Sequence, residues 1–287
     1  MKFIDLDDCV LDALGLFAGR GVPELILKRY KRPLVVGSGN AAATGRILFE
    51  DTDAVFADES TFVRELETID VDGCVLISAS GGKHAPLIVK ELRKRGKEVI
   101  LLTCNPNPLA KPDQTFVFPK QTEPYTYNTS TYMGMILAKT REDPQAIANH
   151  LKSIKIPDLS GYGAFFFIVP DEFDTVRELF MTKFDELFGP MINGRAFTPD
   201  QTEHAKTVTE SDKELFISLG YDNRIWGTKR LNVPLPGWGR HATVMATGYY
   251  IIGKIQKANE PFFKRNIVSY AKKVSKIFGQ EIKPIVE

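Results

Sequence analysis

The sequence predicts an α/β protein built from parallel sheets that helices cover on both faces. Short apolar runs rich in β-branched residues recur along the chain, and segments with helical spacing of apolar residues lie between them. Gly- and Ser-rich turns follow several of these runs. Strands that are apolar on both faces and alternate with helices are typical of parallel sheets buried between helical layers.

The first half of the chain predicts one complete layer of this kind. We expect strands over 33–37, 54–57, 73–78, 98–103 and 115–118, and helices over 41–50, 60–69, 85–96 and 128–139. In the third of these helices, Ala85, Ile88, Val89 and Leu92 form one apolar stripe. Five such strands fit a doubly wound, flavodoxin-like unit, which binds ligands outside the carboxyl ends of its strands.

The second half of the chain echoes the first. We expect strands over 164–170, 214–220 and 230–236, and helices over 171–188, 241–257 and 262–278. Pro157 and the small residues between 160 and 163 indicate a boundary. The fold class is therefore α/β, with two flavodoxin-like three-layer αβα units, one over residues 1–150 and a divergent one over residues 158–287.

Composition excludes several classes of partner. Lys and Arg number 37 and Asp and Glu 36, so no global basic field favours a nucleic acid or an anionic membrane. Because the start of the chain is acidic and broken by charges, we expect no signal peptide there, and no apolar run is long enough to span a bilayer. The three cysteines show no paired spacing, which indicates a reduced, cytoplasmic protein. No cluster has the spacing of a metal site, and we expect no cofactor.

Two Gly/Ser-rich turns follow predicted strands, at 37–40 and 78–83. Each leads into a helix, whose free N–H groups and positive dipole end favour an anion. In the second turn, Ser78 and Ser80 stand two positions apart along the strand end, so both hydroxyl groups can reach one anion, and Lys83 adds a positive charge. The first turn does not have the glycine spacing of a dinucleotide site, and for that motif a tight turn without a ligand stays open as the alternative.

These segments resemble a known family. The stretches 37–45 and 77–111 resemble the SIS (sugar isomerase) phosphosugar-binding domain, and the segment 123–134 resembles its Glu-led loop and Ser/Thr-rich helix start. The resemblance covers about residues 33–137, and the length of the chain is similar to that of the family's double-unit isomerases. Lys83 stands where the family usually has Thr, which either strengthens anion binding or marks a different anion.

The resemblance implies a ligand, a site and an assembly. The ligand is a phosphorylated sugar, bound without a metal or organic cofactor, in a homodimer with sites near the interface. The residues expected to bind it are Gly37, Ser38, Gly39, Asn40, Ser78, Ser80, Gly81, Lys83, Glu123 and Ser130. The first strand of the second unit ends in an acidic stretch, "IVPDEFD", which repels phosphate, so we expect one phosphate site per chain, in the first unit.

The resemblance also implies aldose–ketose isomerisation through an enediol(ate), with a Glu as base and a His that assists ring opening. The segment "DQTEHAKTV" offers Glu203 as the base and His204 as its assistant. A solvent-facing helix end is the alternative interpretation of that segment. His241, Lys254 and Arg195 are further candidates.

The sequence leaves other functions open. One is an amino-sugar phosphate deglycase or deaminase, and another is a phosphosugar sensor that binds without turnover. A third is a structural subunit with a vestigial site. If Glu203 does not approach the turns of the first unit within the chain or its dimer, the isomerase hypothesis loses its base.

Overall fold

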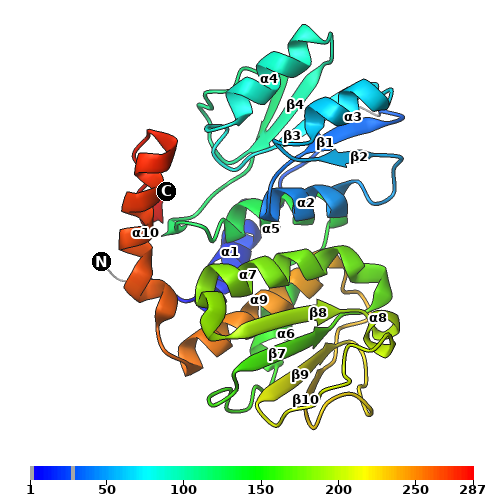
Figure 1. Cartoon of the computed structure of the whole chain (residues 1–287), viewed down its shortest axis with the longest axis vertical. Coiled ribbons are helices and arrows are strands. Elements are labelled where there is room, and N and C mark those ends of the chain that lie inside the picture. The colour runs from blue at the N-terminus through cyan, green and yellow to red at the C-terminus, as the bar shows by residue number, and fades with distance from the viewer. Residues whose placement is uncertain (1–2, 27–29) are drawn as a thin grey trace.

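Two parallel sheets lie at opposite ends of the molecule, with helices between them (Figure 1). The structure, a computed structural model, describes residues 3–26 and 30–287. The first sheet has five strands in the order β2-β1-β3-β4-β5. Its strands are β1 (Pro33–Val36), β2 (Val55–Ala57), β3 (Gly73–Ile77), β4 (Val99–Thr103) and β5 (Gln114–Val117).

Helices cover both faces of this first sheet. Alternate residues of each strand belong to different clusters: Val35 and Val75 to a large inner cluster, Leu34 and Leu76 to a smaller outer one. The outer cluster packs under α3 (Phe62–Thr68) and α4 (Ala85–Lys94), and the inner one under α2 (Asn40–Leu48) and α5 (Thr129–Thr140). The expected three-layer unit with a parallel sheet is confirmed.

The second sheet repeats this winding with four parallel strands, in the order β10-β9-β7-β8. These strands are β7 (Ala164–Ile168), β8 (Asn193–Phe197), β9 (Glu214–Leu219) and β10 (Lys229–Val233). The chain between them forms η1 (Asp171–Val176), α7 (Arg177–Phe188), η2 (Gly189–Met191) and α8 (Pro199–Glu203). No helix joins β9 to β10 in the described segment 220–228, so a helix comparable to α4 is missing from this unit.

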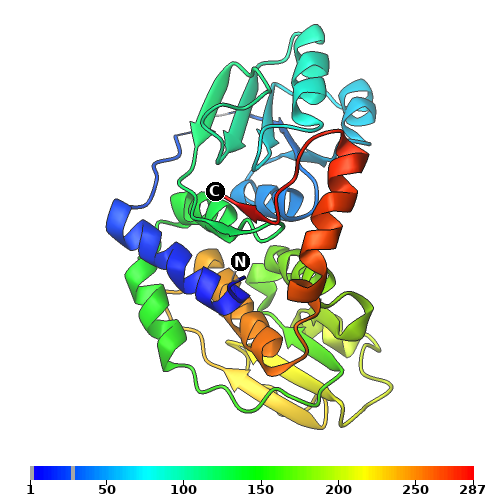
Figure 2. The ribbon, with the colours of Figure 1, turned by 90° about the vertical axis from the view of Figure 1, so that its left-hand side faces the viewer.

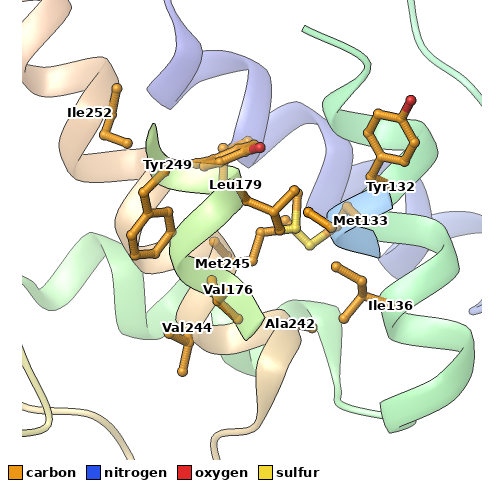
Figure 3. Close-up of a cluster of buried hydrophobic side chains, with 14 of the residues drawn as sticks. Tyr132, Met133, Ile136, Val176, Leu179, Ala242, Val244, Met245, Tyr249 and Ile252 are labelled. Atoms are coloured by element: carbon orange, nitrogen blue, oxygen red, sulfur yellow. The ribbon is translucent and has the colours of Figure 1, made fainter. Parts of the chain in front are cut away.

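One continuous core joins the inner faces of the two sheets. It includes α1 (Leu6–Arg20), α6 (Pro144–Ser153) and α9 (His241–Ala258), and Figure 3 shows how Met133 of α5, Leu179 of α7 and Met245 of α9 meet within it. Gly248 makes the close packing of α7 and α9 possible, because a Cβ there would lie 2.1 Å from the Phe180 ring. The two units therefore share their largest hydrophobic cluster.

The end of the chain returns to the first unit. The long helix α10 (Phe262–Phe278) runs along the outside of the molecule from the second unit to the first (Figure 2). Beyond it, β11 (Ile285–Val286) pairs antiparallel with β6 (Glu123–Pro124). The division of the chain at 150 and 158 stays a prediction, and the last residues of the chain lie beside the first sheet.

Sequence patterns missed three features. The helix α1 has Leu6, Val10 and Phe17 buried at helical spacing, a signal that the adjacent acidic residues obscured. The strand β8 reads "NGRAF", in which Gly and Arg hide the strand pattern. The β6–β11 pair has two residues per strand, too few for any periodicity. In the described part of the chain, no helix has the length and apolar character to cross a membrane.

Candidate functional site

A cavity of about 840 Å³ lies at the carboxyl edge of the first sheet. The turns after β1, β3 and β4 line it, together with part of α7 and the segment that follows α10. Because β2 lies on one side of β1 and β3 on the other, β1 and β3 flank the switch point of the sheet. The cavity therefore lies where doubly wound folds bind their ligands, and its volume suits a small molecule.

The turn after β3 presents hydroxyl groups that are ready to donate. Ser78 Oγ accepts a hydrogen bond from Gly81 N, and Ser80 Oγ accepts one from Gly82 N, each at 3.2 Å. Both bonds use the oxygen lone pairs and leave the hydroxyl hydrogens available for an anion. Gly81 has φ +58°, and a Cβ there would lie 2.4 Å from Pro108 Cβ, so only glycine fits.

Lys83 ends this turn in an uncommon backbone conformation, with φ +51°. Its ammonium donates to Tyr125 Oη at 2.9 Å and lies 4.5 Å from the centre of the Phe278 ring. None of the ion pairs between described residues includes Lys83, and its side chain lines the cavity. The turn after β3, residues 78–83, is the serine turn. The Lys83 charge therefore remains available to an anion that binds on it.

The turn after β1 carries a carboxylate partner. Ser38 Oγ donates to Glu59 Oε2, and both side chains line the cavity. Glu59 follows β2 and so shares the same edge of the sheet. The Ser38 hydroxyl hydrogen is directed to a carboxylate and is not free for a phosphate. This turn therefore offers a phosphate fewer hydrogen-bond donors than the serine turn does. Gly37 and Gly39 complete the turn, with Gly39 at φ +55°.

Glu186 of α7 reaches the cavity from the second unit. Its carboxylate accepts from Lys183 Nζ at 2.5 Å and from Asn40 Nδ2 at 3.3 Å, and 22% of its side chain is exposed. Burial raises the pKa of Glu186, and the Lys183 ammonium opposes part of that rise. Glu186 is thus a carboxylate with a raised pKa in a cavity, which is the usual setting of a general base.

Lys183 itself is fully buried and has its donors in use. Besides Glu186, its ammonium donates to the carbonyl oxygens of Thr126 and Tyr127, at 3.0 and 2.9 Å. These bonds tie α7 to the segment before α5. Lys183 therefore fixes the position and the charge of Glu186 rather than facing a ligand.

Glu123 and Ser130 do not line the cavity. Glu123 is buried and accepts from Thr129 N at 2.8 Å, from Ser130 Oγ at 2.9 Å and from Cys9 Sγ at 3.2 Å. This carboxylate caps the N-terminus of α5 and joins it to α1. Burial raises the pKa of Glu123. The geometry gives both residues a structural position beneath the site, and their expected contact with the ligand stays a prediction.

Glu203 and His204 lie at the end of α8, exposed to solvent, and neither lines the cavity. Figure 1 shows α8 on the opposite side of the molecule from α10, whose end borders the cavity. Within one chain, the structure therefore does not bring these two residues to the serine turn.

The three alternative candidates lie elsewhere. Arg195 pairs with Glu214 at 2.6 Å, and Lys254 pairs with Asp7 at 2.9 Å. His241 is buried beside Glu50, and burial lowers its pKa. None of the three lines the cavity. Among residues 3–26 and 30–287, no group of three metal-ligating side chains is placed to hold an ion.

Comparison with known proteins relates this chain to others by fold. No family model matches the sequence, and neither does any curated protein sequence. The structure is similar to glucosamine-6-phosphate deaminase from Thermotoga maritima, with 16% identity and a TM-score of 0.61, covering 90% of this chain and 94% of that one.

Two further solved structures are similar over almost their whole length. The C-terminal domain of glucosamine-fructose-6-phosphate aminotransferase from Francisella tularensis has 12% identity and a TM-score of 0.62, covering 88% of this chain and 93% of that one. Tagatose-6-phosphate ketose/aldose isomerase from Escherichia coli has 13% identity and a TM-score of 0.58, covering 88% and 89%.

At these identities the likeness shows the fold. The chain has the double-unit α/β fold of these three proteins. The fold that the SIS resemblance implies is thereby confirmed.

Among the carboxylates that line the cavity, sequence reasoning missed Glu59 and Glu186. Glu59 lies in the turn after a predicted strand. The rule that doubly wound folds bind ligands at the carboxyl ends of their strands therefore applied to it as well. Glu186 lies within a helix of the second unit, and nothing in its local sequence distinguishes it from Asp185 beside it. Only the packing of α7 against α2 brings Glu186 to the cavity.

Proposed function

We propose that this protein binds a phosphorylated sugar in the cavity and interconverts its aldose and ketose forms by proton transfer. The observation that carries the proposal is the presence, in one cavity, of a donor-rich serine turn and a partly buried carboxylate with a raised pKa. The fold shared with phosphosugar isomerases and deaminases supports it.

The phosphate is assigned to the turn after β3. The hydroxyl hydrogens of Ser78 and Ser80 donate to its oxygens, and the N-terminus of α4 adds a favourable dipole. Lys83 supplies a full positive charge from the same turn. Because these groups follow strands of a rigid sheet, they are held in place before the ligand arrives, which lowers the entropic cost of binding.

The proton transfer is assigned to Glu186. In its ionised form the carboxylate removes a proton from the carbon next to the sugar carbonyl and gives an enediol(ate). The hydroxyl proton on that carbon passes to the former carbonyl oxygen, and the protonated acid returns its proton to the former carbonyl carbon. A base whose pKa is raised toward the working pH performs both steps more effectively than an ordinary carboxylate. Lys183 and Asn40 hold the carboxylate in one orientation.

Two variants distinguish Glu186 as the base from Glu203, which the sequence suggested. We expect Glu186→Gln to lower turnover by about 10²- to 10⁴-fold while sugar-phosphate binding persists. Glu203→Gln is the matched control, because its carboxylate is exposed and outside the cavity. The assay incubates the protein in D₂O with hexose 6-phosphates and follows deuterium incorporation at C2 by NMR, which detects the enediol(ate) even near equilibrium.

The outcomes distinguish the candidate functions. Loss of exchange in Glu203→Gln alone would return the base to Glu203, which requires a second copy of the chain to bring it to the cavity. The homodimer that the resemblance implies stays a prediction, and light scattering measures it. Binding without C2 exchange in the wild type would favour a sensor, and release of ammonia from an amino-sugar phosphate would favour a deaminase.

A further inference from the structure

The hydroxyl group of Tyr132 belongs neither to the serine turn nor to the proposed base. Tyr132 lies in the first turn of α5, is 6% exposed and lines the cavity. No described residue gives its Oη a hydrogen-bond partner, and this atom is not among the unpartnered polar atoms that are sealed from solvent. Figure 3 shows the hydroxyl directed away from Met133 and the buried cluster. A ligand in the cavity would therefore satisfy a donor that the protein leaves unused.

Tyr132 also lies near the proposed base. Burial raises the pKa of Tyr132, and Glu186 adds to that rise. Cys104, which directly follows β4 and also lines the cavity, acts in the same direction. A phenol with a raised pKa stays protonated at neutral pH, so Tyr132 is a neutral donor and does not compete with the Glu186 carboxylate for a proton.

Two other tyrosines near Glu186 lack one of these properties. Burial and then Glu186 raise the pKa of Tyr249, and for Tyr270 burial acts first, followed by Tyr125 and Glu186. The Tyr249 hydroxyl is sealed in the core, and this residue does not line the cavity. Tyr270 lines the cavity but is 47% exposed, so water competes for its hydroxyl. Of these three tyrosines, Tyr132 combines a buried setting with access to the cavity.

We propose that Tyr132 is a second catalytic residue, which donates a hydrogen bond to the sugar carbonyl oxygen while Glu186 removes the neighbouring proton. The inference rests on the proposed function. The electron pair of the broken C–H bond forms the new C=C bond, and negative charge moves to the carbonyl oxygen. A donor that is already in place, in a site with little water, stabilises this charge more in the transition state than in the bound substrate.

The position of Tyr132 suits this role. The base comes from α7 of the second unit and the donor from α5 of the first, and both helices pack in the core that the units share. Each group is therefore held by a buried helix rather than by a loop. Such a fixed arrangement keeps the donor and the base in place on two sides of one substrate, with little reorganisation during the reaction.

The experiment compares kcat and KM of the full chain with those of two variants in the isomerisation of hexose 6-phosphates. Tyr132→Phe should lower kcat by about 10²- to 10³-fold and leave KM almost unchanged, because the hydrogen bond strengthens only as the charge develops. Tyr249→Phe is the matched control. It removes another buried phenol hydroxyl near the same base but outside the cavity, and should keep the wild-type kcat. Phenylalanine keeps the ring in both variants, so both should fold.

A binding measurement gives a second readout. The probe is 5-phosphoarabinonohydroxamate, a planar analogue of the enediolate, and its affinity is measured by calorimetry. Tyr132→Phe should weaken the binding of this analogue by at least about tenfold, while its affinity for hexose 6-phosphates stays unchanged. A residue with a purely structural role would change both affinities together.

The outcomes separate this inference from the proposed function. Wild-type kcat in Tyr132→Phe, or an equal loss of kcat in both variants, would overturn the role of Tyr132 and leave the proposed function standing. The same holds if Tyr132→Phe weakens the analogue and the hexose 6-phosphates equally. If the wild type exchanges no proton at C2 of any hexose 6-phosphate, the proposed function fails, and this inference fails with it.

Discussion

Asn40 and Glu186 are 146 positions apart in the chain, and the Asn40 side-chain amide donates to the Glu186 carboxylate at 3.3 Å. Asn40 begins the helix that follows the first strand of the first unit, and Glu186 lies near the end of the corresponding helix in the second. The bond places a carboxylate of the second unit beside the ligand-binding edge of the first. The two units thus contribute different chemistry to one cavity.

The pH dependence of turnover should reflect the environment of Glu186. Burial raises the pKa of this carboxyl above its ordinary value of 4.5. Since the ionised form is the base, we expect activity to fall as the pH drops through that raised pKa, at a higher pH than for an ordinary glutamate. Initial rates of isomerisation from pH 4 to pH 8 measure this limb. An activity that stays constant down to the ordinary glutamate range would contradict the assignment.

The same shift has the opposite sign for stability. The folded protein binds more protons than the unfolded chain between the ordinary and the raised pKa of Glu186. The contribution of Glu186 to stability is therefore present below its unfolded pKa and is lost as the pH rises through the folded one.

Replacing Lys183 should shift the acidic limb of the pH–rate profile. The Lys183 ammonium lowers the pKa of Glu186, so Lys183→Met should shift the limb of the rate profile to higher pH. Methionine has a similar length and suits a buried position. As a control, Lys257→Met removes an ion pair with Asp7 outside the cavity and should leave the limb in place. Movement of the limb in both variants would show that it reports global stability rather than Glu186.

The serine turn should carry much of the affinity for phosphate. Each hydrogen bond to a charged group is worth about 1.5–3 kcal/mol, so Ser78→Ala and Ser80→Ala should each weaken sugar-phosphate binding by at least tenfold. Ser160→Ala, which removes an exposed serine bonded to Asp158, is the control. Calorimetric titration with hexose 6-phosphates decides the matter. Wild-type affinity in both turn variants would place the phosphate elsewhere.

Lys83 should contribute through its charge. Lys83→Met keeps a side chain of similar length and removes the ammonium that lies over the Phe278 ring, so affinity for sugar phosphates should fall and should depend less on salt. Titrations at two ionic strengths measure both effects. An unchanged salt dependence would mean that Lys83 stays with Tyr125 and Phe278 when the ligand binds.

Glu142 should matter for stability rather than for binding. Its buried carboxylate accepts from the main-chain N–H groups of Arg240, Ala242 and Thr243, at 2.7, 2.9 and 3.0 Å, and so caps α9 from the segment after α5. Glu142→Ala leaves these donors, two of them buried, without this partner and should lower the free energy of unfolding by about 3 kcal/mol. Denaturant titration measures the loss, and the exposed Glu210→Ala should change it little. A loss below about 0.5 kcal/mol would show that solvent replaces the cap.

Much of the fold could be predicted because its signals are local. The strand over 73–77 is apolar throughout, and the helix over 262–278 carries its apolar residues on one face. Each pattern is therefore compatible with only one arrangement of buried and exposed faces. The serine turn was predictable for the same reason, since a turn after a parallel strand must lie at the carboxyl edge. The short pair β6–β11 was not predictable, because its partners lie at distant positions and pair through main-chain atoms.

The sequence by itself determined the class of the fold and the position of the serine turn, because hydrophobic periodicity and turn chemistry act over a few neighbouring residues. The tertiary structure alone decided which carboxylates share the cavity with that turn. Glu186 and Glu203 are both glutamates at the ends of helices in the second unit. The packing of α7 against α2 turns one of them toward the first unit, and α8 leaves the other in solvent. Which glutamate faces the cavity depends on how the two units pack around their common core, and this packing cannot be predicted from a short stretch of sequence.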